Sequence, residues 1–171
     1  MNLLKKEKKE SILELGSGAG LDAKFFQNKG FKVLATDLSK KMVKVCQKKG
    51  LKAKVVDLYQ LSSLNNEFDA IYSMNVLLHI PRKDLVKILN NIYKTLNKNG
   101  IFFYGVYGGK DEEKIITDKT KMGLPRFFSF LSNKTLLNAI KDKFNVIDFK
   151  KIDIDSENLD FYFQSLFLRK K

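Results

Sequence analysis

Three glycines and a carboxylate near the N-terminus have the types and the spacing of a nucleoside-binding site. The stretch ILELGSGAG, residues 12–20, is a hydrophobic run that ends with glycines at alternate positions, and Asp37 closes the next hydrophobic run. Glycines after a strand let a ligand approach bare backbone. A carboxylate at the following strand end accepts hydrogen bonds from both hydroxyls of a ribose. The pattern predicts a ligand with an unphosphorylated ribose.

The glycine spacing disfavours the two common phosphate-binding motifs. A dinucleotide fingerprint requires Gly-x-Gly-x-x-Gly, but its last position is occupied by Leu21, and no Lys-Ser or Lys-Thr follows as in a P-loop. Asp57, at the end of the third predicted strand, is well placed for an adenine amino group. A ligand that contains adenine and ribose and needs no phosphate-binding helix end fits S-adenosylmethionine.

The single histidine, His79, is the candidate general base. It follows the fourth predicted strand in the stretch NVLLHIP. A neutral imidazole is suited to removing a proton from an oxygen or nitrogen nucleophile. The structural alternative is that His79 caps the next helix or packs beneath it.

Alternating strands and helices must position these residues. Strands are predicted at 11–16, 31–37, 51–57, 68–75, 101–108, 144–153 and 159–169, and helices at 21–28, 38–50, 81–100 and 133–141. Strands joined through helices imply parallel pairing with right-handed crossovers. The last two strands, joined by a turn around Ser156 to Asn158, imply an antiparallel hairpin.

The composition is that of one globular domain. The chain has 171 residues, of which 44% are hydrophobic and 14 are Phe. Residues 1–10 form a short charged segment without a signal-peptide core, and no apolar run approaches the roughly 20 residues that span a bilayer. One cysteine, Cys46, excludes an internal disulfide and a Cys-based zinc site. We expect a cytoplasmic protein without a metal or a membrane contact.

The net charge of +13 raises the question of a nucleic-acid partner. Only three of the 32 basic residues are arginines, although arginine is favoured at phosphates for its bidentate fork. We therefore interpret the charge as a general lysine bias and regard a nucleic-acid partner as the less favoured alternative.

Five motifs in order resemble the class I S-adenosylmethionine-dependent methyltransferases: ILELGSGAG, VLATDLS, VVDL, FDAIYSMNVLLHIP and LNKNGIFFYGVYG. The resemblance covers roughly residues 11–108. It implies an α/β fold, a three-layer αβα sandwich with helices on both faces of a seven-stranded, mostly parallel sheet. The expected strand order is 3-2-1-4-5-7-6 with the last strand antiparallel, in a single domain spanning residues 1–171.

The resemblance also implies roles for the loop after the first strand. The methionyl and ribose part of the cofactor would be held by Glu14, Gly16, Ser17 and Gly18. The two glycines would let the backbone come close to the cofactor. The alternative for Glu14 is a simple bond to a nearby backbone N–H.

The following strand ends would hold the rest of the cofactor. Asp37 would bind the ribose diol, and Leu38 would pack on the adenine. Asp57 and Leu58 would contact the adenine edge.

Met74 and Asn75 would line the methionine and the transferring methyl group, although Met74 could equally be core filler.

The acceptor site is expected on the long connection 108–131, a candidate substrate or lid loop. Its lining candidates are Tyr107, Arg126 and Phe127, whereas PRFFSF could equally tie the loop to the core. Only about eleven residues precede the first strand, where many relatives have helices that close over the cofactor. We therefore expect a more open site.

The expected function is methyl transfer to a small molecule by in-line displacement, giving S-adenosylhomocysteine. The stretch 73–76 reads Ser-Met-Asn-Val, not the Asn-Pro-Pro-aromatic of enzymes that methylate base amino groups. Cys46 lies inside a predicted helix, which disfavours pyrimidine C5 chemistry. The alternatives are an RNA methyltransferase, a non-catalytic cofactor-binding partner protein and, disfavoured by the glycine spacing, a nicotinamide oxidoreductase. A monomer and a homodimer are both compatible with the sequence.

Overall fold

The computed structural model describes residues 2–64, 67–117, 124–154 and 161–171. The main sheet contains seven strands: β1 (Ser11–Leu15), β2 (Lys32–Asp37), β3 (Lys52–Val55), β4 (Phe68–Met74), β5 (Leu96–Gly108), β8 (Phe144–Asp153) and β9 (Tyr162–Lys170). The helices are α1 (Asn2–Lys6), α2 (Leu21–Asn28), α3 (Lys40–Lys48), α4 (Arg82–Thr95) and α5 (Asn133–Ile140), with short 3-10 helices η1 (Leu58–Leu64) and η2 (Leu77–His79). A separate two-stranded sheet pairs β6 (Glu112–Thr117) with β7 (Pro125–Phe130).

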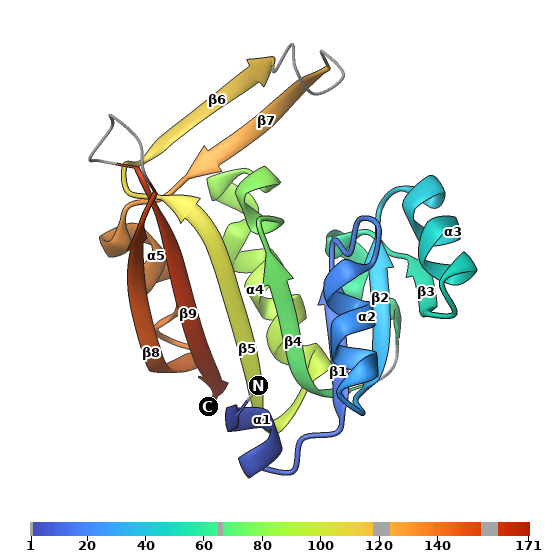
Figure 1. Ribbon diagram of the computed structural model, residues 1–171. Helices are drawn as coiled ribbons and strands as arrows, with labels where there is room; N and C mark the ends of the chain where they lie inside the picture. Colours follow the sequence, from blue (N-terminus) through green and yellow to red (C-terminus); the bar gives the residue numbers. More distant parts are fainter. Residues whose placement is uncertain (1, 65–66, 118–123, 155–160) are drawn as a thin grey trace.

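The strand order of the main sheet is β3-β2-β1-β4-β5-β9-β8 (Figure 1). The pairs among β1 to β5 are parallel, and β9 runs antiparallel to both of its neighbours. The predicted α/β class is confirmed, and the predicted order is recovered once β6 and β7 are left out of the numbering. The predicted pairing of the last two strands is also confirmed, although their turn lies outside the described residues.

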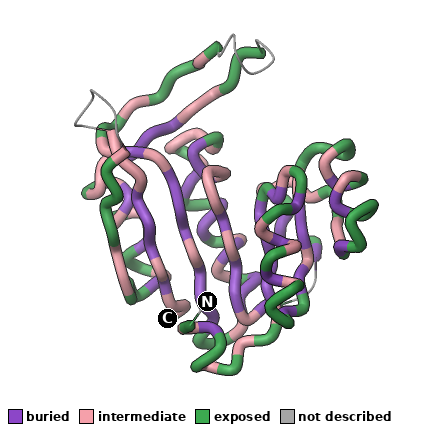
Figure 2. Tube along the Cα trace, in the orientation of Figure 1, coloured by how far each residue is buried: buried purple, intermediate pink, exposed green. Residues whose placement is uncertain are grey.

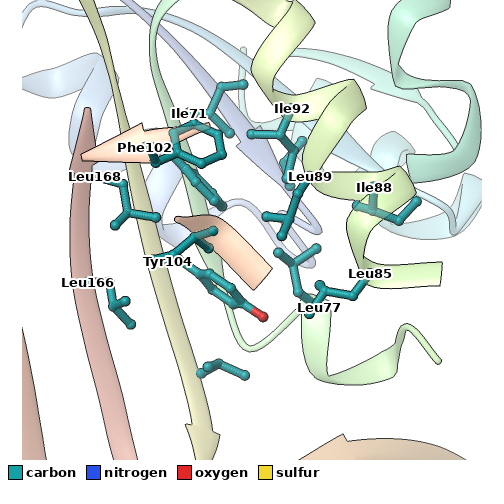
Figure 3. Close-up of a cluster of buried hydrophobic side chains, with 14 of the residues drawn as sticks. Ile71, Leu77, Leu85, Ile88, Leu89, Ile92, Phe102, Tyr104, Leu166 and Leu168 are labelled. Carbon is teal, nitrogen blue, oxygen red and sulfur yellow. The ribbon is translucent and has the colours of Figure 1, made fainter. Parts of the chain in front are cut away.

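The larger core lies between the sheet and the layer formed by η1, α4 and α5. Helix α4 presents Leu85, Ile88, Leu89 and Ile92 at helical spacing, and all four are buried against β4, β5 and β9 (Figure 3). These four side chains hold α4, which connects β4 to β5, against the sheet, and this packing determines the position of the end of β4.

The opposite face of the sheet is covered less completely. Helix α2 buries Ala23 and Phe26, and α3 buries Cys46, in a second core over β1 and β2. The predicted helices on both faces are present, but in Figure 1 no helix of the described residues lies over this face of β5, β9 and β8 except the short α1 at one end. A cavity of about 230 Å³ remains beside α2, and its walls include Leu4, Phe25 and Phe167. Buried residues concentrate on the central strands (Figure 2).

Two local predictions are corrected by the structure. The helix predicted at 81–100 ends at Thr95, because Leu96 adopts an extended backbone and begins β5 opposite Phe68. Leu96 matched the helical spacing only because it is fully buried in the strand.

The connection 108–131, expected as a loop, contains the antiparallel pair β6–β7. Its β-branched and aromatic residues pair in register from Glu112 opposite Phe130 to Thr117 opposite Pro125.

The charged segment 1–10 includes helix α1. Its Leu4 is buried, and Glu7 forms an ion pair with Arg169 of β9. None of the described helices has the length and apolar character needed to cross a membrane.

Asp69, near the start of β4, connects the start of β1 with the start of β5. Its carboxylate accepts hydrogen bonds from the N–H groups of Glu10 and Ser11 and from the Ser11 hydroxyl, all at 3.0 Å, and from Asn97 Nδ2 at 2.9 Å. Partial burial raises the pKa of Asp69, but these hydrogen bonds outweigh it and lower the pKa to about 2.

We expect Asp69→Asn to lower the free energy of unfolding by about 1.5–3 kcal/mol at pH 7, because charge-assisted hydrogen bonds are lost. The folded pKa lies below the unfolded value, so the advantage of the wild type is full above about pH 4 and shrinks as the pH falls towards 2. Urea unfolding across this pH range measures it, with the exposed Asp142→Asn as the matched control. If the difference in unfolding free energy between the wild type and Asp69→Asn did not change with pH, the lowered pKa of Asp69 would be contradicted.

Candidate functional site

The loops that follow β1, β2 and β4 meet at the carboxyl edge of the sheet. The Ser17 N–H donates to the Thr36 carbonyl oxygen at 2.8 Å, which holds the β1 loop against β2. The Gly18 N–H donates to Asp37 Oδ2, and the Ser39 N–H donates to Asp37 Oδ1, both at 2.8 Å. Each oxygen of the Asp37 carboxylate therefore has one backbone donor and a further lone pair for a ligand.

The glycines of the β1 loop have different tasks. Gly16 has φ +63°, and a Cβ there would lie 2.4 Å from Cγ2 of Val76, so it lets the loops after β1 and β4 touch. Gly18 has φ +51°, and within the described residues a Cβ there would meet nothing within 4 Å. The backbone at Gly18 therefore borders open space, as a ligand cradle requires.

Glu14 is a buried acid beneath this loop, with only 3% of its surface exposed. Its Oε2 has no hydrogen-bond partner among the described residues. Burial, and next the negative charge of Asp22, raise the pKa of Glu14 to about 8. Its carboxyl group is therefore mostly neutral at pH 7 and would ionise beside a cation.

The end of β4 contributes a second unpartnered atom. Asn75 has a left-handed backbone with φ +55°, and its N–H donates to the Gly105 carbonyl oxygen at 2.8 Å. Its buried Oδ1 has no partner within the described part of the chain. Met74 is half-buried and pairs with Gly105 across the β4–β5 ladder.

The predicted adenine contacts are less uniform. Asp57 Oδ1 accepts the Tyr59 N–H at 2.9 Å, so this carboxylate also fixes the start of η1. Leu58 packs against the larger core, whereas Leu38 is 69% exposed beside Asp37. Leu38 is thus the more accessible of the two apolar candidates.

His79 contacts the β6–β7 pair. Its Nδ1 lies 2.8 Å from the Phe127 carbonyl oxygen, and its ring centroid lies 4.9 Å from that of Phe128. A carbonyl oxygen only accepts, so Nδ1 carries the hydrogen and Nε2 is left as an acceptor. His79 does not cap α4, because the Arg82 N–H at its start donates to Glu113 Oε1 at 2.6 Å.

The three predicted acceptor residues are only partly brought together. Tyr107 is half-buried at the end of β5, while Arg126 is exposed on β7 and Phe127 offers its carbonyl to His79. Phe128 and Phe130 were not among the predicted residues, yet their rings stack at 5.6 Å on the side of β7 that contacts His79. Alternation along PRFFSF could have separated these two from Phe127 had it been read as a strand.

Comparisons with known proteins agree with this arrangement. A family model described as a methyltransferase domain matches residues 12–100, more than half of the chain. A tRNA U34 carboxymethyltransferase from Campylobacter jejuni subsp. jejuni serotype O:23/36 (strain 81-176) is 29% identical over 118 residues, which cover 66% of this chain. The chain spans 40% of the length of that relative.

Solved structures share the fold. An S-adenosylmethionine-dependent methyltransferase from Methanosarcina mazei superposes with a TM-score of 0.81 at 14% identity, covering 95% of this chain and 92% of the other. The 1,6-didemethyltoxoflavin-N1-methyltransferase of Burkholderia thailandensis, solved with its substrate and S-adenosylhomocysteine, gives a TM-score of 0.73 at 18% identity, covering 99% and 75%. The resemblance read from the motifs is confirmed, and the chain belongs to the methyltransferase domain family.

Proposed function

We propose that this protein transfers a methyl group from S-adenosylmethionine to a small-molecule acceptor. The observation that carries the proposal is a pair of buried oxygens, Glu14 Oε2 and Asn75 Oδ1, without partners among the described residues. Glu14 lies near the end of β1 and Asn75 directly follows β4, at the edge where the Gly18 backbone borders open space. Buried polar atoms without partners are few in folded proteins, so two at one edge suggest a polar ligand.

The residues of the β1 loop fit the methionyl and ribose part of this cofactor. Glu14 would pair with the α-ammonium group, while Gly16 and Gly18 shape the loop and Ser17 holds it against β2. Asp37 would accept both ribose hydroxyls with its free lone pairs.

The remaining cofactor contacts follow the neighbouring strand ends. Leu38 would pack on one face of the adenine, with Asp57 and Leu58 at its edge. Met74 and Asn75 would lie beside the methyl group.

The chemistry asks the protein mainly for positioning and removal of a proton. Bound S-adenosylmethionine supplies a methyl group on a sulfonium, and displacement by the acceptor's lone pair leaves the C–S electron pair on sulfur. His79 Nε2, the free acceptor of the ring, would take the proton from an O–H or N–H acceptor. The Phe127 carbonyl would hold His79 in the tautomer that this step needs.

Three observations favour a small acceptor over RNA. The toxoflavin-type neighbour acts on a small ring compound and aligns with nearly the whole chain. The relative named for tRNA is matched over only 40% of its length, and arginines are few in this chain.

The experiment that tests the proposal uses tritium-labelled methyl donor and an extract of the source cells, divided into a small-molecule and an RNA fraction. Label in the small-molecule fraction is the expected result. Label only in RNA would select the RNA alternative. Binding of S-adenosylhomocysteine without transfer to either fraction would indicate a non-catalytic cofactor-binding protein.

We expect Asp37→Ala to weaken S-adenosylhomocysteine binding by about ten- to a hundredfold, because hydrogen bonds to a charged acceptor are lost. Isothermal titration calorimetry measures the affinity, and Asp142→Ala is the control for loss of a carboxylate. Thermal melting must show a folded variant, since the Gly18 and Ser39 N–H groups also lose their partner. Unchanged affinity would place the ribose elsewhere.

We expect S-adenosylmethionine binding at pH 7 to release close to one proton from Glu14, because the ligand's ammonium lowers a pKa that stands at about 8. Calorimetry in two buffers of different ionisation enthalpy counts this proton, and Glu14→Gln should bind more weakly and release less.

The unliganded protein supplies a second readout for Glu14. Its folded pKa exceeds the unfolded value, so stability should fall as the pH rises from about 4.5 to 8. This slope should be weaker in Glu14→Gln. If the wild type and Glu14→Gln release the same number of protons on binding S-adenosylmethionine, Glu14 is not part of the site.

We expect His79→Asn and His79→Ala both to lower turnover by about 10²–10⁴-fold, because both lack Nε2. The side-chain amide introduced by His79→Asn can still donate an N–H to the Phe127 carbonyl, so only His79→Ala should also lower the melting temperature. Full turnover in a folded His79→Asn variant would show that His79 is structural.

A further inference from the structure

A continuous set of rings extends from His79 past the end of β5 to Phe163 of β9. We call it the aromatic row: His79, Phe128, Phe130, Phe161, Tyr107 and Phe163. Successive ring centroids are 4.9, 5.6, 5.0, 5.7 and 5.3 Å apart. These spacings are those of stacked and edge-to-face aromatic pairs.

Part of the row, with Tyr107, lies on the same face of the sheet as the buried acid of the cofactor site, whereas Phe128 packs against the larger core on the other face. Glu14 pairs with Tyr72, and Met74 pairs with Gly105. Because side chains alternate along a strand, Tyr72 and Met74 lie on one face, and Gly105 and Tyr107 lie on that same face. The row therefore starts just after β4, at His79, and crosses the carboxyl end of β5 to β9, beside the edge where the methyl group is proposed to lie.

Polar anchors hold the hairpin that supplies the middle of the row. Glu113 of β6 accepts the Arg82 N–H at the start of α4. Asp111 accepts the Ser132 N–H and the Thr135 hydroxyl, both at 2.7 Å, at the start of α5. The rings of β7 are thus positioned before any acceptor binds, which reduces the entropic cost of binding.

The row is more accessible than the aromatic group of the larger core. Phe102, Tyr104 and Phe144 are at most 2% exposed in the larger core. Phe128 and Tyr107, by contrast, are half-buried. Ring surface that remains accessible beside a free imidazole nitrogen is suited to a flat ligand.

We propose that the methyl acceptor is a planar aromatic or heteroaromatic molecule with an O–H or N–H on its ring. The ring stacks on the aromatic row, which directs that O–H or N–H to His79 Nε2. This inference rests on the proposed function for the position of the methyl donor. It makes Phe128 and Tyr107 specificity-determining residues, in addition to the base.

The test compares 2-naphthol with decahydro-2-naphthol, which has the same skeleton without a planar ring. Each is titrated into the protein saturated with S-adenosylhomocysteine. We expect 2-naphthol to bind roughly tenfold more tightly, and Phe128→Leu and Tyr107→Leu each to weaken it by about threefold to tenfold. Phe25→Leu is the matched control, because Phe25 is 48% exposed on α2 and outside the row.

Equal binding of the two alcohols, or no binding of either, would overturn the proposal. So would weakening by Phe25→Leu alone, because it would place 2-naphthol in the cavity beside α2. A prior titration with S-adenosylhomocysteine alone tests the proposed function separately. If that ligand does not bind, the proposed function fails, and the titration of the unliganded protein with the two alcohols then decides only whether the aromatic row binds a planar ring.

Discussion

The site depends on the contact between the Asp37 carboxylate and the backbone N–H groups of Gly18 and Ser39. This side chain ties together the loops after β1 and β2. Because both oxygens are already oriented, a ribose would bind without first ordering the carboxylate. The left-handed backbone at Gly18 is what lets its N–H reach this side chain.

The larger core buries apolar side chains, whereas the site near Asp37 buries polar oxygens. The apolar side chains of the larger core pack α4 against the sheet. This packing fixes the connection from β4 to β5 and so determines the position of Asn75. Glu14 and Asn75, in contrast, keep buried oxygens without partners in the described residues. Such atoms reduce stability, so the packed core supports a site that is complete only with ligand.

The parts of the site that could be predicted from sequence are those encoded locally. The glycines after β1 and Asp37 lie at strand ends that hydrophobic runs reveal, and α2 begins and ends where its pattern indicates. The surroundings of His79 could not be predicted, because its partner carbonyl at Phe127 lies 48 residues away. The end of α4 was missed for a similar reason: Leu96 suits a helix or a strand until its pairing with Phe68 is known.

The two edge strands of the main sheet, β3 and β8, give the excess of lysines a physical meaning. Lys52 and Lys54 are exposed on β3, and Lys150 and Lys151 are exposed on β8. An edge strand offers unpaired backbone groups to another chain, and lysines hinder that pairing through charge repulsion and their hydrated ammonium groups. Acetylation of these four lysines would remove their charge, so they would no longer hinder edge-to-edge association of copies.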